Sequence, residues 1–192
     1  MEHKIAEIKF FFDIQVDCYI LGDLERLMNI QFNYGDCGGC SIPIGMVIIS
    51  AMEMFGTLLT ENPSESRGTE YLKNFMEFYV PEISSEDRNS IVYNYRHKMM
   101  HVFFPKIDYP KMYGVTRLPV NGELIHKPDG YIRLLNIPEF CRLFRGGVER
   151  LRKKIFEERD ELIINTIYNN LHIEQSETNS STTGQQSTSR IG

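Results

Sequence analysis

The run formed by residues 85–104 constrains the fold most, because it predicts one helix that is apolar on two sides. Ser84 can cap its first turn with Asp87 completing a capping box, and Pro105 disfavours helical geometry at the residue before it. One apolar stripe is an ordinary core face. The second apolar ridge consists of Tyr93, Met100 and Phe104. Such a helix lies at the centre of its domain or between its own core and a partner surface.

Three ionisable side chains flank the second ridge, with Arg96 on one side and His97 and His101 on the other. We expect them to lie in a partly buried groove. The run Arg96-His-Lys-Met-Met-His101 resembles the Arg-polar-x-x-x-His signature of the HEPN superfamily, whose members are small helical-bundle proteins and often metal-independent endoribonucleases. The resemblance covers residues 1–105 and makes no statement about the remainder.

The resemblance implies a chemistry for these residues. RNA cleavage without a metal needs proton transfer at the 2′-hydroxyl and at the leaving 5′-oxygen, which an imidazole can perform, so His101 is the candidate acid–base group. Arg96 would bind the phosphate and stabilise its developing charge. In HEPN nucleases two such sites face each other across a homodimer, and the second apolar ridge suits that interface. The expected supporting residues are His97, Asn94, Glu53 and Tyr93.

Glu53 admits two interpretations. It lies on a narrow polar line of an otherwise apolar helix, which favours a solvated stripe. A carboxylate in apolar surroundings also needs a cationic or hydrogen-bonding partner, which would turn it toward Arg96 or the histidines. HEPN-like proteins commonly place a polar or acidic residue on this helix.

Two alternatives to catalysis remain open. Arg96 could simply pair with Glu53 or another carboxylate, in a non-catalytic HEPN-like dimer that binds a protein or nucleotide partner. The motif could also be accidental in a structural helical protein. For the nuclease, the superfamily suggests a toxin or defence role, with an antitoxin-like protein as a possible partner.

Helical spacing of apolar residues organises most of the chain into a mainly α fold. We predict an up-and-down, HEPN-like four-helix bundle in residues 1–105, with helices over 2–30, 41–59, 69–80 and 85–104. Ser41 is the predicted N-cap of the second helix.

Beyond the bundle the pattern changes. Short strand-like runs separated by turn signals predict a small antiparallel β-meander as an insertion over residues 106–136. Asn136 can cap a long C-terminal helix over 137–173 that packs on the bundle and that Gly146-Gly147 could kink. Residues 174–192 have almost no apolar side chains and predict a disordered tail.

Composition narrows the class of protein. With 192 residues and a net charge of -5, the chain has the size and charge of an ordinary globular protein. The negative charge argues against a protein that coats nucleic acids in general, but it is compatible with a local RNA site. We see no stretch with the length of apolar residues that a membrane span needs, and no signal-peptide layout, so we expect a cytoplasmic protein with no membrane contact.

We expect no cofactor and no metal. His97 and His101 share a helix face but lack the glutamate of an H-E-x-x-H zinc motif. Cys37-Gly-Gly-Cys40 has no second cysteine pair to complete a four-ligand site, so a flexible turn is favoured over a metal or redox role, with anion binding as a third option. The basic residues of the last helix are diluted by carboxylates into a mixed solvated face.

Overall fold

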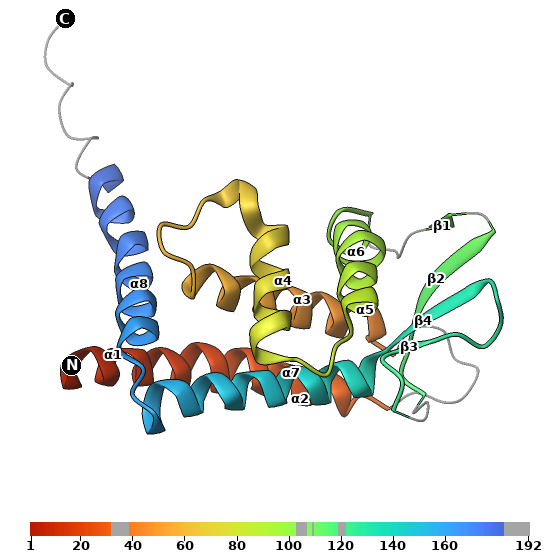
Figure 1. Ribbon diagram of the computed structural model, residues 1–192, viewed down its shortest axis with the longest axis horizontal. Helices are drawn as coiled ribbons and strands as arrows, with labels where there is room; N and C mark the ends of the chain where they lie inside the picture. The colour runs from red at the N-terminus through yellow and green to blue at the C-terminus, as the bar shows by residue number, and fades with distance from the viewer. Residues whose placement is uncertain (32–38, 103–106, 109, 119–121, 183–192) are drawn as a thin grey trace, which may run out of the picture.

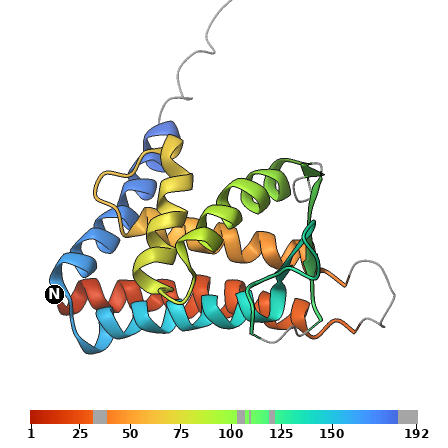
Figure 2. The same ribbon diagram turned by 45° about the vertical axis from the view of Figure 1, so that its right-hand side comes forward.

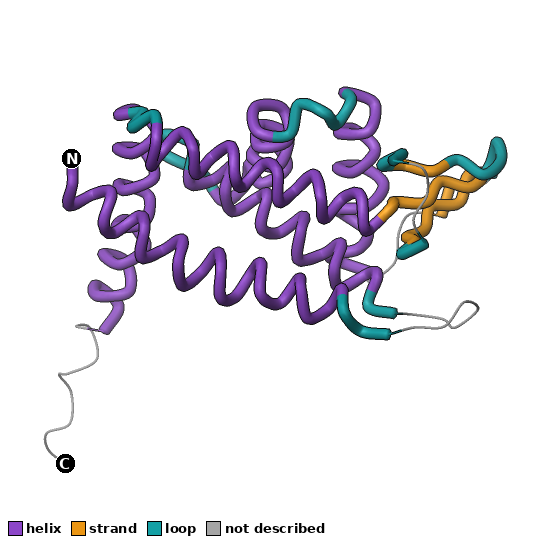
Figure 3. Tube along the Cα trace, turned by 90° about the horizontal axis from the view of Figure 1, so that it is seen from below, coloured by secondary structure: helices purple, strands orange, loops and turns teal. Residues whose placement is uncertain are grey.

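Figure 1 shows a computed structural model of the chain, which describes residues 1–31, 39–102, 107–108, 110–118 and 122–182. The described part is mainly helical, with a small four-stranded sheet at one end of the helices (Figure 3). The predicted mainly α architecture with a small sheet is therefore confirmed.

The chain begins with one continuous helical rod. Its parts are α1 (Glu2–Phe11), the π-helical segment η1 (Phe12–Leu21) and α2 (Gly22–Met28). The backbone stays right-handed helical at both junctions, so the predicted first helix is confirmed almost to its expected end. Its buried residues Ile8, Phe12, Val16 and Leu24 form the stripe that faces the core.

The second helix, α3 (Ser41–Leu58), is the most deeply buried element of the N-terminal half. Cys40 precedes it in the left-handed conformation (φ 57°), so Ser41 is the first helical residue and its prediction as the N-cap is wrong. By length and composition alone α3 could cross a membrane, which corrects the expectation that no stretch could. Its window is 56% buried inside the protein, as in a core helix.

A short 3₁₀ turn, η2 (Glu65–Arg67), leads into α4 (Gly68–Tyr79), which confirms the predicted third helix. α3 and α4 approach each other closely at Gly56. A Cβ at that position would lie 2.0 Å from the carbonyl oxygen of Tyr71, so only glycine allows the two backbones to pack at this distance.

The fourth predicted helix is a second continuous rod. It comprises α5 (Ser85–Ser90), π-helical η3 (Ile91–Arg96) and α6 (His97–Val102). Ser84 caps it as predicted, because its Oγ accepts a hydrogen bond from the Asp87 amide (3.1 Å) and donates to the Asp87 carboxylate (3.0 Å). The predicted end of this helix, Phe104 and Pro105, lies outside the described residues.

The sheet corrects the predicted antiparallel meander. Its strands are β1 (Ile107–Asp108), β2 (Lys111–Thr116), β3 (Ile125–His126) and β4 (Ile132–Asn136), in the order β1-β2-β4-β3. β2 and β4 are parallel, whereas β3 is antiparallel to β4 at the edge. After β2, the guanidinium of Arg117 bonds the carbonyl oxygens of Ile30 and Gly39. These bonds connect the residue after β2 to the segments that follow α2 and precede α3.

The C-terminal region contains two helices, where the sequence predicted one. α7 (Ile137–Arg152), capped by Asn136 as predicted, continues into π-helical η4 (Lys153–Glu157), and α8 (Glu161–Thr182) follows. The break lies at Arg159 (φ 54°), after which Asp160 accepts a hydrogen bond from the Ile163 amide (3.1 Å). α8 also includes residues 174–182, which the sequence assigned to a disordered tail.

The first rod and α7 run side by side and antiparallel along the base of the molecule (Figure 2). Arg152 pairs with Asp17, and its guanidinium lies over the ring of Phe12. Above this base a column of aromatic rings joins four elements. Phe12 stacks on Phe55, Phe55 on Phe75, and Phe144 of α7 packs against Phe55 (ring centroids 5.3–6.3 Å apart). The helices therefore share one hydrophobic core.

Candidate functional site

Arg96, at the end of η3, forms a two-pronged ion pair with Glu53 of α3. Arg96 Nε donates to Glu53 Oε2 (2.8 Å) and Nη2 donates to Oε1 (2.7 Å). The two side chains are 20% and 27% exposed, so the pair is partly buried. Hydrogen bonding to Glu53 raises the pKa of the Arg96 guanidinium, against the lowering effect of burial. Of the two interpretations of Glu53, the one that turns it toward Arg96 is confirmed.

Gly68, the first residue of α4, completes this site. A Cβ at residue 68 would lie 2.0 Å from Glu53 Oε1 and 3.0 Å from Arg96 Nη2. The ion pair therefore occupies the space that any other side chain would need. The amino end of a helix carries a partial positive charge, which favours the Glu53 carboxylate at this place. Nothing in the sequence pattern pointed to Gly68.

The structure describes the side chain of only one of the two histidines of the motif. His97 begins α6 directly after Arg96 and is exposed. His101 also belongs to α6, but its side chain lies outside the part of the chain that the structure describes. The structure thus brings Arg96 and Glu53 together, and the pairing of Arg96 with His101 stays a prediction.

The other two predicted supporting residues form hydrogen bonds with residues other than Arg96 and Glu53. Tyr93 is 62% exposed, and its hydroxyl accepts a hydrogen bond from Lys73 Nζ (3.3 Å), which also lies 4.8 Å from the ring centroid. Asn94 Nδ2 donates along the helix to Ser90 Oγ (3.2 Å). Both residues line a groove between this helix and the sheet, with a volume of about 260 Å³. We call it the helix–sheet groove, and its polar lining includes Tyr93, Asn94, Lys111, Tyr113, Lys127 and Arg133.

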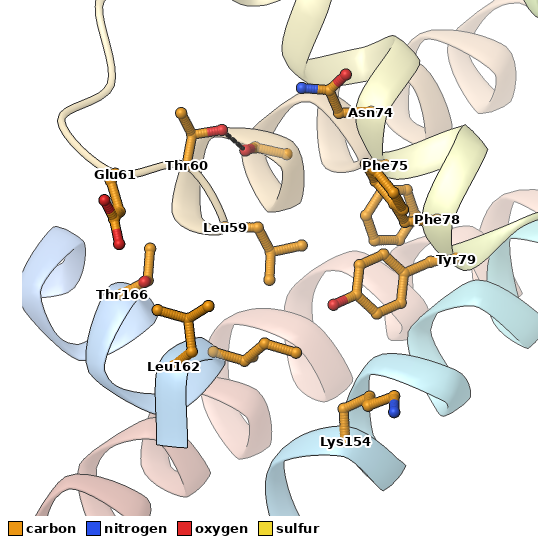
Figure 4. Close-up of a pocket in the computed structure, with 12 residues that line it drawn as sticks. Leu59, Thr60, Glu61, Asn74, Phe75, Phe78, Tyr79, Lys154, Leu162 and Thr166 are labelled. Atoms are coloured by element: carbon orange, nitrogen blue, oxygen red, sulfur yellow. Dashed lines mark hydrogen bonds between the residues drawn. The ribbon is translucent and has the colours of Figure 1, made fainter. Parts of the chain in front are cut away.

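A separate cavity of about 480 Å³ lies between the carboxyl end of α3, α4 and α8 (Figure 4). Phe78 and Tyr79 form one wall and Leu59 and Leu162 the opposite one, with Glu61 at the rim. Burial raises the pKa of the Tyr79 phenol to about 12. None of the sequence-predicted site residues lines this cavity. Its lining comes from segments far apart in the sequence, which is why no local pattern revealed it.

A cluster of ionisable groups joins α1 to α8. Glu7 bonds the Nε2 atoms of both His3 and His172, each at 2.7 Å. No group of three or more histidine, cysteine or acidic side chains within the described ranges is arranged to hold a metal ion. Cys37 lies outside those ranges, so the role of the Cys37–Cys40 pair stays open.

Comparison of the chain with protein-family models, with curated proteins and with solved structures gives no match.

Proposed function

We propose that this protein is a HEPN-like, metal-independent endoribonuclease that cleaves single-stranded RNA and acts as a cytoplasmic homodimer. One observation carries the proposal. Arg96 of the Arg-polar-x-x-x-His motif is held at a fixed place by two hydrogen bonds to Glu53, in a partly exposed position beside Gly68. A guanidinium that must meet a phosphate in one orientation benefits from such a support.

In the proposed reaction, the 2′-hydroxyl loses its proton and attacks the adjacent phosphorus, the bond from phosphorus to the 5′-oxygen breaks, and that oxygen receives a proton. His101 performs proton transfer, because an imidazole titrates near neutral pH. Arg96 has five N–H donors, of which Glu53 engages two, and the others can bind the non-bridging phosphate oxygens. Glu53 is a positioning residue that acts through Arg96.

The dimer is part of the proposal because a second copy would supply the second acid–base group. By analogy with HEPN nucleases, the motif helices of two copies would face each other. A toxin or defence role with an antitoxin-like partner follows the same analogy.

The test is cleavage of a mixed set of RNAs in EDTA by the wild type, Arg96→Ala and His101→Ala, with end-group determination of the products. Arg142→Ala is the matched control for Arg96, because Arg142 also forms a two-pronged pair, with Glu139, and its side chain is 65% exposed. His126→Ala serves the same purpose for His101. We expect cyclic phosphate or 3′-phosphate ends from the wild type and both controls, and at least a hundredfold loss in the two motif variants.

The second candidate is a non-catalytic HEPN-like dimer that binds a protein or nucleotide partner. The observation that favours it is the same ion pair, since Glu53 occupies both Nε and Nη2 of Arg96, as in a purely structural bridge. A folded, dimeric wild type that cleaves none of the RNAs supports this candidate. An activity that chelation abolishes rejects the proposed site.

A further inference from the structure

We propose that the helix–sheet groove binds the backbone of single-stranded RNA and leads the strand to Arg96. The inference rests on the proposed function and gives the sheet a role in it. The groove lies on the rod that carries Arg96, and its polar lining combines lysine and arginine side chains with tyrosines and an asparagine. Single-stranded nucleic acids are bound by this combination, with cations on the phosphates and aromatic rings under the bases.

The balance of charge in the groove is opposite to that of the whole chain. Three cations line it, Lys111, Lys127 and Arg133, against the two carboxylates Glu86 and Asp87. The whole chain has 21 lysines and arginines against 26 acidic residues. The groove thus has one excess positive charge, whereas the chain has a net charge of -5. Phosphate binding depends on such a local arrangement of cations.

The carboxylates of the groove form an ion pair with only one of its three cations. Glu86 pairs with Lys127 (3.1 Å), and Asp87 accepts a hydrogen bond from the Ser84 hydroxyl at the helix start. Arg133 donates to the backbone carbonyls of Asp129 and Ile132. Among the side chains that the structure describes, no carboxylate lies at ion-pair distance from Lys111 or Arg133, although the pKa of the Asp129 carboxyl is lowered by the Ile132 backbone amide and, to a smaller extent, by the Arg133 guanidinium. An anion entering the groove would therefore meet two cations that have no ion-pair partner.

The two walls of the groove are held together beside Arg96. The hydroxyl of buried Tyr95 donates to the carbonyl oxygen of Arg133 on β4 (3.0 Å), and its ring packs edge-on against Tyr113 of β2 (centroids 5.9 Å apart). Tyr95 directly precedes Arg96 in η3. The sheet is consequently fixed to the same turn of helix that presents Arg96, so a strand bound in the groove would reach the ion pair in a defined register.

The groove also runs in a direction that would lead a bound strand toward the motif. Tyr93 lines it, and residues four apart lie on the same side of a helix, so the next turn on that side begins at His97. A strand lying across Tyr93 and Asn94 continues along the rod toward the motif.

The test measures binding separately from cleavage. A 5′-labelled single-stranded RNA with 2′-O-methyl groups cannot react through its 2′-oxygen, so fluorescence anisotropy reports affinity alone. The variant Lys111→Glu with Lys127→Glu is compared with Lys9→Glu with Lys153→Glu. The control changes the net charge equally and uses lysines of α1 and η4, away from the sheet (Figure 1). We expect the groove variant to bind at least about tenfold more weakly at 100 mM salt, with a smaller salt dependence, and the control within about twofold of the wild type.

Equal losses in the two double variants would mean that only overall charge matters, and would overturn the inference. So would a wild type that does not bind the strand. The nuclease proposal can fail separately. If the wild type binds through the groove but cuts no RNA, this inference stands and the nuclease proposal is rejected. If the wild type cuts RNA and the groove variant has the same Kd and KM as the wild type, this inference is rejected and the nuclease proposal stands.

Discussion

The backbone of Gly68 lies directly against the carboxylate of Glu53, so that a Cβ at residue 68 would be 2.0 Å from Oε1 and 2.8 Å from Cδ of that carboxylate. Three helical segments meet at this contact, because Glu53 belongs to α3, Gly68 begins α4 and Arg96 ends η3. The ion pair in this geometry therefore requires that residue 68 have no side chain.

Gly68→Ala tests this dependence. The atoms that the new methyl group would meet are the ends of two long side chains, so we expect the ion pair to move and the backbone to stay in place. Losing the partly buried pair costs about 1 kcal/mol, which offsets the usual gain of about 0.5–1 kcal/mol for alanine over glycine in a helix. Urea unfolding should therefore show little net stabilisation, and RNA cleavage should fall toward that of Arg96→Ala.

Gly146→Ala is the matched control for Gly68→Ala. Gly146 lies inside α7, and only the Arg150 guanidinium lies within reach of a Cβ there, at 3.9 Å. Without a contact to break, the substitution should stabilise the protein by about 0.5–1 kcal/mol. If both alanine variants are stabilised equally, the close contact between Gly68 and Glu53 has no energetic consequence.

Asn170 provides a prediction about stability alone. Its buried amide, on α8, donates to the carbonyl oxygens of Leu58 (3.0 Å), Thr60 (2.8 Å) and Thr57 (3.3 Å) at the carboxyl end of α3. The Thr57 carbonyl also accepts a hydrogen bond from the Thr60 amide (3.1 Å), so the Asn170 amide matters most for the carbonyls of Leu58 and Thr60. Asn170→Ala should cost about 2–3 kcal/mol, because it removes the donor and leaves buried acceptors unpaired. Exposed Asn169→Ala should stay within about 0.5 kcal/mol, and an equal effect of the two would contradict the capping role.

The helices were predictable because their signals are local. Ser84 and Asn136 both have the short polar side chain that an N-cap needs, and both cap as expected. α7 is one continuous helix through Gly146 and Gly147, where the sequence suggested a possible kink, and the packing against the end of α4 explains Gly147. A Cβ at Gly147 would lie 2.8 Å from Val80 Cγ2, so this glycine permits close helix packing within a continuous α7.

The features that the sequence could not reveal depend on contacts between residues far apart in the chain. β2 and β4 pair in parallel although β3 lies between them in the sequence, and after β2 the acceptors of Arg117, Ile30 and Gly39, are 87 and 78 residues away. At the site, a partner for Glu53 was predictable, since a carboxylate on an apolar helix needs one. The contribution of Gly68 was not, because a glycine at a helix start carries no sign of what lies against it.

Tyr79 predicts a dependence of stability on alkaline pH. Burial, with a smaller contribution from nearby Asp160, raises the pKa of its phenol from the ordinary value of about 10 to about 12. Between these values the unfolded chain releases a proton that the folded protein retains. Its contribution to stability is thus complete below pH 10 and is lost as the pH rises to about 12.

The measurement is urea unfolding of the wild type and Tyr79→Phe between pH 9 and pH 12. The free energy of unfolding should decline less steeply in the variant, because the buried phenol no longer titrates. Tyr131→Phe, at a 60% exposed position, is the control and should follow the wild type. Parallel curves for all three proteins would show that burial of Tyr79 does not affect its ionisation.

The ion pair at the start of α4 predicts an asymmetry between its two partners. The amino end of the helix attracts the Glu53 carboxylate and repels the Arg96 guanidinium. Removing Arg96 therefore leaves Glu53 in a favourable place, whereas removing the charge of Glu53 leaves Arg96 partly buried beside a positive helix end. We expect Glu53→Gln to destabilise the protein more than Arg96→Met does, by about 0.5–1 kcal/mol. A double-mutant cycle by urea unfolding should give a coupling energy of about 1–2 kcal/mol, and equal single effects with no coupling would refute this description of the site.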